Sequence, residues 1–314
     1  MYKILQMEEQ NINEVMDLWH KDHLNYCNNK FLQNFFPGGK QNIKNYLIEQ
    51  IKKGNAILVK DYDNSVLGYF SWVYINFHNE RSVLCPTIGH CSRNIDKENI
   101  YTHLYNHASK EWIKNDTFNH LWMIYFKDIL LREFSYNLGF GSYVGDAIKQ
   151  IEPIRGFTYQ YKISRATEDN VDILYGLLEE SRHFYLDPPV FLKRPITTKD
   201  KILKMIEETL IFLAWENNEA IGFIHIWKND EYHIENLSIP GSISLGIFIK
   251  SEHRNKGIGK SLLNKVYEYC DENSKKYAHV SFETSNINAN RFWIKNFEPI
   301  ILSVRRTINK DANQ

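Results

Sequence analysis

The stretch from Ser251 to Leu263, Ser-Glu-His-Arg-Asn-Lys-Gly-Ile-Gly-Lys-Ser-Leu-Leu, says most about the fold of this chain of 314 residues. The apolar run Ile243–Ile249 comes before it and predicts a strand, and the amphipathic pattern of Gly259–Glu272 predicts a helix after it. The core reads Arg-x-x-Gly-x-Gly, and its two glycines allow a tight turn that can approach a ligand closely. The free N–H groups of the helix's first turn, together with the helix dipole, would then favour an anion such as a pyrophosphate.

Cationic side chains surround this turn: Lys250, Arg254, Lys256 and Lys260. Two other phosphate-binding motifs fit the sequence less well. The dinucleotide fingerprint Gly-x-Gly-x-x-Gly requires a third glycine where Leu262 stands. A Walker P-loop would match Gly259-Lys260-Ser261, but it requires a glycine where Arg254 stands. The context of strand, turn and helix therefore indicates a different kind of phosphate site.

A second pattern follows downstream. His279–Thr284 predicts a strand, and Asn286–Phe297 predicts a helix after it. In their order, the two patterns resemble the coenzyme A signatures of the GNAT acetyltransferases, and the resemblance runs from Tyr161 to Gln314. The second signature of that family is approximately Asn-x-x-Ala-x-x-Phe-Tyr-x-x-x-Gly-Phe. The matching residues are Asn286, Ala289, Phe292 and Phe297, whereas Trp293 replaces the usual Tyr and Asn296 the usual Gly.

Composition narrows the class of protein. Lys plus Arg equals Asp plus Glu at 38 each, which argues against a nucleic-acid partner or a polybasic membrane anchor. A hydrophobic content of 43% is enough for packed cores. No run is long enough for a membrane helix, the start has no signal-peptide core, and no Cys-x-x-Cys pair occurs. We therefore expect a cytoplasmic protein with free thiols and no membrane partner.

The two halves of the chain are similar to each other, which predicts a tandem repeat. Tyr2-Lys3-Ile4 corresponds to Tyr161-Lys162-Ile163, and each segment leads into a helical pattern. Each half also predicts a hairpin, around Asp63-Asn64 in the first and around Asn217-Asn218 in the second. With a link at Ile151–Thr158, the expected domains are residues 1–152 and residues 158–314.

The first copy lacks the glycine turn. When Ile100–Leu104 is aligned with Ile258–Leu262, Asp96 and Glu98 place negative charge where phosphate would lie. Tyr101 then occupies the position of the second glycine. We expect a degenerate first domain that does not bind coenzyme A in the usual way and that supports the structure or the acceptor site.

The resemblance implies an α+β fold of three layers. It consists of two tandem GNAT-like domains, each a mixed, mostly antiparallel twisted sheet flanked by helices. It also implies acetyl-CoA as co-substrate, with the pantetheine arm in a gap between strands near Leu245–Ile249 and His279–Thr284. Carried over position by position, the residues expected to bind it are Ile247, Phe248, Ile249, Arg254, Asn255, Lys256, Gly257, Ile258, Gly259, Lys260, Asn286 and Phe292. A backbone N–H near Phe248 would polarise the thioester carbonyl.

The implied reaction is transfer of an acetyl group to a primary amine by direct attack in a ternary complex. The acceptor would be a small molecule or a peptide, and the protein a monomer or a homodimer. Two alternatives remain open at this point. One is an acyl-CoA-binding module without transferase activity, and the other is a small-molecule acyltransferase similar to the tandem mycothiol synthases.

The amine must be neutral to attack, so a base or a desolvating site is needed. Glu235 is the candidate base, with His233 close to it in the sequence, although an exposed loop is the simpler explanation of both residues. Glu179 and Glu180 are further candidates, which a solvated helix face also explains. Trp293 has no acidic proton for the leaving thiolate, but a thiol can depart as a thiolate.

No metal is expected. A helix is predicted over Ile100–Lys114, and His103 and His107 on one of its faces have a spacing that can hold a metal. No third ligand is evident, so they are expected to be surface histidines. The four cysteines Cys27, Cys85, Cys91 and Cys270 are expected to be free thiols, with Cys85 and Cys91 buried. Trp19, Trp112 and Trp122 are expected to be packing residues.

Overall fold

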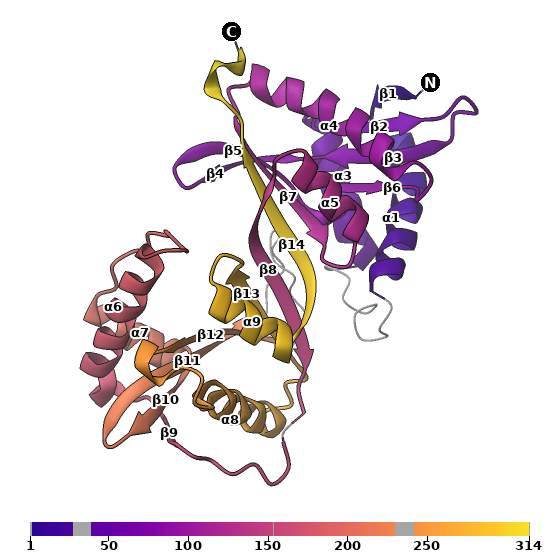
Figure 1. Cartoon of the computed structure of the whole chain (residues 1–314). Coiled ribbons are helices and arrows are strands. Elements are labelled where there is room, and N and C mark those ends of the chain that lie inside the picture. The colour runs from indigo at the N-terminus through magenta and orange to yellow at the C-terminus, as the bar shows by residue number, and fades with distance from the viewer. Residues whose placement is uncertain (1, 28–38, 153, 230–241, 314) are drawn as a thin grey trace. The chain divides into compact units, whose positions relative to one another are not determined.

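The computed structural model of the chain describes residues 2–27, 39–152, 154–229 and 242–313 (Figure 1). These residues fall into two compact units. The first comprises the described residues up to 146 together with 299–313, and the second those from 147 to 229 together with 242–298.

The first unit contains four α-helices, three short 3-10 helices and two groups of strands among its described residues. The α-helices are α1 (Ile12–Tyr26), α3 (Gly39–Lys52), α4 (Lys97–Lys114) and α5 (Ile129–Asn137). The 3-10 helices are η1 (Glu9–Asn11), η2 (Thr87–Gly89) and η5 (Lys310–Asn313). One group of strands has the order β1 (Lys3–Gln6), β2 (Ala56–Lys60), β3 (Val66–Ser71) and β6 (His90–Ser92). The other has the order β4 (Val73–Phe77), β5 (Glu80–Cys85), β7 (Asn119–Tyr125) and β14 (Glu298–Thr307).

Aromatic side chains fill the core of the first unit. Trp112 of α4 and Trp122 of β7 are almost completely buried, and each packs against Phe70 of β3. The strands are apolar on both faces where helices cover both sides, as the fully buried pattern of β7 shows. The expectation that Trp19, Trp112 and Trp122 are packing residues is confirmed.

The second unit also begins with a strand and two helices that lead into a β-hairpin. Its helices are the short η3 (Glu168–Asn170), α6 (Val171–Leu186), α7 (Lys199–Glu208), the short η4 (Ser251–His253), α8 (Ile258–Glu272) and α9 (Ile287–Asn296). Its strands, in sheet order, are β13 (Tyr277–Glu283), β12 (Ser242–Ile249), β11 (Glu219–Asn229), β10 (Leu210–Glu216) and β9 (Lys162–Arg165). Strand β8 (Gly141–Gln150) begins in the first unit and ends beside β13.

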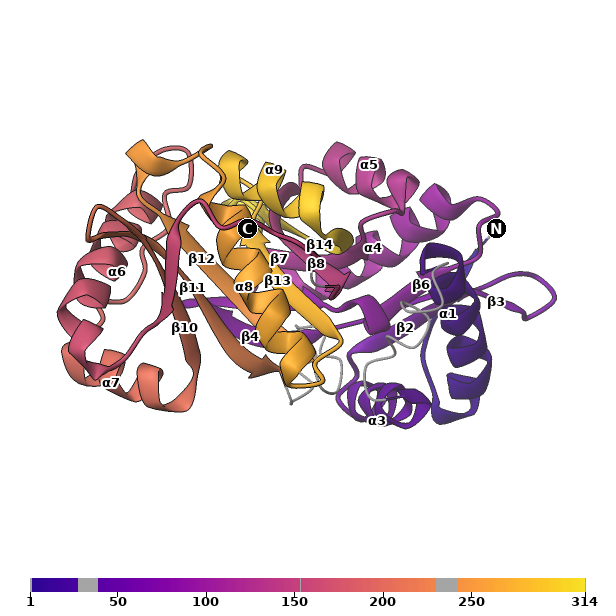
Figure 2. The same ribbon diagram turned by 90° about the horizontal axis from the view of Figure 1, so that it is seen from below.

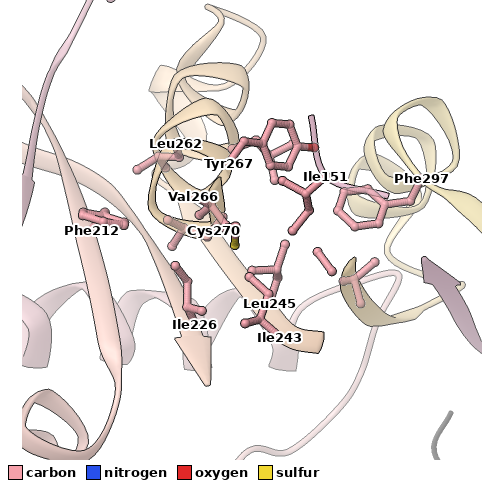
Figure 3. Close-up of a cluster of buried hydrophobic side chains, with 14 of the residues drawn as sticks. Ile151, Phe212, Ile226, Ile243, Leu245, Leu262, Val266, Tyr267, Cys270 and Phe297 are labelled. Atoms are coloured by element: carbon pink, nitrogen blue, oxygen red, sulfur yellow. The ribbon is translucent and has the colours of Figure 1, made fainter. Parts of the chain in front are cut away.

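Helices cover both faces of the second sheet (Figure 2). On one face, Leu174 and Leu177 of α6 pack with Leu213 of β10. On the other face, side chains of α8 lie over Ile226 and Leu245, as Figure 3 shows. Alternate residues of β12 therefore enter different cores, and this alternation fixes which of its side chains face α8.

The observed architecture confirms the α+β class with mostly antiparallel sheets flanked by helices. Both predicted hairpins are present, since β2 pairs with β3 and β10 with β11. Their turns place Asn64, Asn217 and Asn218 at positive φ, a conformation that asparagine tolerates.

The C-terminal segment differs from the expected division. The sequence assigns residues 158–314 to one domain, but β14 pairs antiparallel with β7, from Ile301 opposite Tyr125 to Thr307 opposite Asn119. Leu302 of β14 belongs to the core of the first unit. The last strand therefore belongs to the first unit rather than to the second.

Candidate functional site

Strands β12 and β13 separate along their length. They are parallel, but they pair only at their beginnings, where Ile243 is opposite Ala278 and Ser244 is opposite His279. Strand β12 remains paired with β11 along its whole length. The end of β12, residues 245–249, therefore has one edge that no strand covers among the described residues.

Specific backbone groups of β12 face this uncovered edge. The N–H of Lys250 donates to the carbonyl of Ile221 on the β11 side. Because backbone groups of an antiparallel strand alternate in direction, Phe248 also directs its N–H and C=O toward β11. Ile247 and Ile249 direct theirs into the gap. The predicted polarising group near Phe248 is thus narrowed to the N–H of Ile247 or Ile249, not that of Phe248 itself.

The turn between β12 and α8 exposes the start of the helix. Gly257 is the N-cap residue with φ of 88°, and Asn255 has φ of 62°. Gly257 has no side chain that could cap the helix, so the N–H groups of Ile258, Gly259 and Lys260 have no side-chain acceptor. These N–H groups and the helix dipole make the turn a site for an anion.

Helix α9 forms the other wall of the site. Asn286 is its N-cap residue, and its side-chain oxygen accepts a hydrogen bond from the N–H of Ala289 at 3.2 Å. Phe292 of α9 lies against Gly259, where an added Cβ would be 2.9 Å from the Phe292 ring. Glycine at this position is therefore required by the close approach of α8 and α9.

A cavity of about 290 Å³ lies between these elements, entirely within the second unit. Its lining contains every residue that the sequence assigned to cofactor binding except Lys256: Ile247, Phe248, Ile249, Arg254, Asn255, Gly257, Ile258, Gly259, Lys260, Asn286 and Phe292. The carbonyl of Lys256 instead accepts a hydrogen bond from the hydroxyl of Tyr161. The structure thus brings two distant sequence patterns around one hollow.

Sequence reasoning missed the remaining lining residues: Phe184, Tyr185, His253, Asn288, Ala289, Lys295 and Asn296. Phe184 and Tyr185 lie at the end of α6, far from both signatures in the sequence. Aromatic residues at the end of an amphipathic helix are typical of core packing, so no local signal distinguished them. Ala289 and Asn296 were noted as part of the second signature, and only their contact with the cavity is new.

The cavity has a positive lining. Neither Lys260 nor Lys295 has an ion pair with any described carboxylate, and both reach the cavity wall. The guanidinium of Arg254 lies 4.2 Å from the centre of the Phe184 ring, and its Nε donates to the carbonyl of Ile249 at 3.0 Å. Arg254 therefore holds the turn against both β12 and α6 while it contributes charge to the site.

The corresponding region of the first unit has a different structure. The segment between β6 and α4 is short, with Asp96 as N-cap residue at φ of 58°, and α4 begins at Lys97, three residues before the expected Ile100. The Nζ of Lys97 is buried and lies 2.6 Å from Asp128 and 2.9 Å from the hydroxyl of Tyr26. The first residue of α4 thus carries a buried, ion-paired cation, whereas the first turn of α8 lines the cavity.

The predicted catalytic residues are placed as follows. Glu235 and His233 lie outside the described residues. Glu179 forms an ion pair with Arg182 at 2.7 Å, and the hydrogen bonds from Arg182 lower the pKa of Glu179. Trp293 is 3% exposed and packs in the core beside Phe297, so it does not line the cavity.

Within the described ranges, no three histidine, cysteine, aspartate or glutamate side chains are arranged to hold a metal ion. None of the helices in the described part of the chain has the length and apolar character needed to cross a bilayer. All four cysteines are buried.

Comparison with known proteins connects this site to a family. The model of the acetyltransferase (GNAT) family matches residues 173–297, which span α6 to α9. The chain is 29% identical over 132 residues to an uncharacterized N-acetyltransferase of Archaeoglobus fulgidus, an alignment that covers 42% of this chain and 88% of the relative.

Solved structures show the same fold. A GCN5-related N-acetyltransferase of Sphaerobacter thermophilus aligns with a TM-score of 0.58 and 13% identity, over 98% of this chain and 96% of that one. The glucosamine N-acetyltransferase region of a fungal multi-domain β-N-acetylglucosaminidase aligns with a TM-score of 0.50 and 10% identity, over 97% of this chain and 38% of that one. Residues 173–297 therefore match the GNAT acetyltransferase family and are similar to a curated N-acetyltransferase, and the chain as a whole shares its fold with a GCN5-related N-acetyltransferase.

Proposed function

We propose that the chain transfers an acetyl group from acetyl-CoA to a primary amine by direct attack in a ternary complex formed in the second unit. The observation that carries the proposal is the cavity itself, which joins the uncovered edge of β12 to the open N-terminus of α8. A nucleotide thioester has a diphosphate at one end and an extended amide-containing arm at the other. These two chemical parts match the two backbone features.

The residues present fit this co-substrate. The N–H groups of Ile258, Gly259 and Lys260 would hold the pyrophosphate, and the Lys260 ammonium would add a charge-assisted contact. The amides of the pantetheine arm would pair with Ile247 and Ile249 as an added strand does. The ring of Phe292 would supply an apolar wall.

The chemistry that these residues support is acyl transfer by positioning. The amine nitrogen forms a bond to the carbonyl carbon, the C–S bond breaks, and the amine proton is released. The N–H of Ile247 or Ile249 would stabilise the charge that develops on the carbonyl oxygen. Holding the two reactants together can lower the barrier by about 7–11 kcal/mol. Glu235 remains the predicted base.

The test is thiol release from acetyl-CoA in the presence of a panel of primary amines. The panel should contain a polyamine, free lysine, a peptide with an alanine N-terminus, and glucosamine, the substrate named for one structural neighbour. Amine-dependent release that is lost in Gly257→Asp would support the proposal. Acetyl-CoA binding without release on any amine would contradict it and favour an acyl-CoA-binding module.

A further inference from the structure

A group of polar side chains lies at the α6 side of the cavity. Tyr185, near the end of α6, lines the cavity together with Asn286. The guanidinium carbon of Arg194 is 3.6 Å from the centre of the Tyr185 ring, and its Nη2 is 3.0 Å from Oε1 of Glu283. The Tyr185 hydroxyl interacts with the side chains of Glu283 and Asn286. These contacts connect the end of α6 to the end of β13 and the start of α9.

The contacts fix where the phenol lies. Arg194 covers one face of the Tyr185 ring, and the ion pair with Glu283 holds Arg194 in turn. The ring is half-buried, and desolvation raises the pKa of Tyr185 above its ordinary value of 10.0. At neutral pH the hydroxyl therefore keeps its proton and can donate it.

The reaction proposed above needs such a donor. When the C–S bond breaks, its electron pair goes to sulfur. A thiolate is a weak base with a conjugate pKa near 8.5, so a neutral hydroxyl can stabilise it by a hydrogen bond or a proton. Among the described residues that line the cavity, Tyr185 is the only one that carries a hydroxyl. Trp293 has no acidic proton and lies in the core.

We propose that Tyr185 is the general acid of this acetyltransferase, with its hydroxyl donating to the sulfur that leaves. The inference rests on the proposed function. The new bond joins the amine nitrogen to the carbonyl carbon, and the C–S pair passes to sulfur, which takes the proton of the Tyr185 hydroxyl. The proton that the amine nitrogen loses returns to the phenolate through solvent, so no other reactant is needed.

The variant that tests this is Tyr185→Phe, which keeps the ring and its contact with Arg194 but removes the hydroxyl. Tyr175→Phe is the matched control, because Tyr175 lies on the same helix but does not line the cavity. Isothermal titration with acetyl-CoA establishes that each variant is folded and binds. The affinity of Tyr185→Phe should remain within about twofold of the unchanged protein, since no phosphate contact is removed.

One measurement needs no acceptor amine. It is the ionisation of the thiol of bound coenzyme A, which is monitored through the ultraviolet absorbance of the thiolate across a pH series. A hydroxyl that donates to sulfur stabilises the thiolate. The ionisation constant of the bound thiol should therefore fall about tenfold in Tyr185→Phe and stay unchanged in Tyr175→Phe. Turnover with an amine identified from the panel should fall by about 10²-fold or more in kcat, with KM for acetyl-CoA unchanged.

An identical thiol titration in Tyr185→Phe and the unchanged protein would overturn the role of Tyr185 while leaving the proposed function in place. Loss of acetyl-CoA binding in Tyr185→Phe alone would also overturn it, because the hydroxyl would then serve binding. Failure of the unchanged protein to bind coenzyme A would overturn the proposed function, and this inference with it.

Discussion

Gly259 illustrates how one residue determines the shape of the cavity. Its Cα faces the ring of Phe292, and an added Cβ would lie 2.9 Å and 3.0 Å from two ring carbons. Contacts this short force a shift of the Phe292 ring, which lines the cavity, or of α9 itself. The residue therefore couples the start of α8 to the wall of the site.

Replacing this glycine should weaken cofactor binding. We expect Gly259→Ala to lower the affinity for acetyl-CoA by about tenfold or more, because such overpacking typically costs about 1–3 kcal/mol. Isothermal titration measures the change. Gly176→Ala is the control: an added Cβ there has no neighbour within 4 Å, and alanine within α6 should raise stability slightly without changing affinity. Equal affinity in Gly259→Ala and the unchanged protein would contradict the account.

At this scale the sequence predicted the turn better than it predicted the rest of the lining. Arg254, Gly257 and Gly259 lie within a few residues of one another, and their chemistry depends on local backbone geometry. Tyr185 reaches the cavity only because α6 folds back over the sheet. Its place follows from packing between segments far apart in the chain, which a local pattern does not contain.

At the scale of elements, α4 and α8 show how the same kind of helix can begin with opposite chemistry. The buried ammonium of Lys97 lies 2.6 Å from Asp128 and 4.0 Å from Asp22. Asp128 is the N-cap residue of α5, as Asn286 is of α9. In the first unit, the first residue of α4 is thus held in a buried ion pair, whereas the first turn of α8 in the second unit borders the cavity.

Removing this cation should destabilise the protein. We expect Lys97→Met to lower the free energy of unfolding by about 3–5 kcal/mol, because two buried carboxylates would lose their partner. Urea denaturation measures the loss. The triple variant Lys97→Met, Asp22→Asn, Asp128→Asn should recover most of it, since the asparagine at 128 can still accept from the N–H of Leu131. A single variant as stable as the unchanged protein would show that the ion group contributes little.

The start of α4 also shows a limit of alignment between the halves. The sequence predicts a helix from Ile100, by comparison with Ile258, and the structure begins it at Lys97. The contacts at this start are tertiary, because Lys97 is buried against Asp22 and Asp128, which lie far from it in the sequence. The prediction that the first copy lacks the glycine turn does not depend on this shift.

At the scale of the whole molecule, the pairing of the last strand, β14, with β7 of the first unit could not be predicted from the sequence. Strand β14 follows α9 directly in the chain but completes the sheet of the first unit beside β7. Strand β7 of the first unit and strand β13 of the second are both apolar and similar in length, so the hydrophobic pattern of the sequence does not show which of them pairs with β14. The choice depends on side-chain contacts such as that of Arg305, whose Nε donates to Asn119 at 2.7 Å.

The stability of the first unit should depend on pH through buried histidines. Burial lowers the pKa of His23, His90 and His120 to about 4, against an ordinary value of 6.5. Between pH 6.5 and 4 the unfolded chain therefore binds protons that the folded chain does not, so stability is present above pH 6.5 and is lost as the pH falls. Burial raises the pKa of Asp22 to about 6. This group therefore increases the stability of the folded state as the pH falls over the same range, opposite to the histidines.

The three histidines contribute more to the pH dependence of the free energy of unfolding than the single aspartate does. We expect the free energy of unfolding to fall by roughly 2–3 kcal/mol per pH unit near pH 5, measured by urea denaturation across a pH series. The variant His120→Asn removes one titrating group and should reduce this slope by about 1 kcal/mol per pH unit, whatever its effect on stability at neutral pH. A stability that rises as the pH falls from 6.5 to 5 would contradict these assignments.

The most direct test of the central claim is isothermal titration of the full chain with acetyl-CoA, in the unchanged protein and in two variants. Gly257→Asp places a carboxylate at a residue with φ of 88° at the start of α8, and Asn99→Asp makes the matched change in the first unit. We predict one site per chain, lost in Gly257→Asp and retained in Asn99→Asp. Equal loss in both variants, or no binding by the unchanged protein, would contradict the assignment of the site to the second unit.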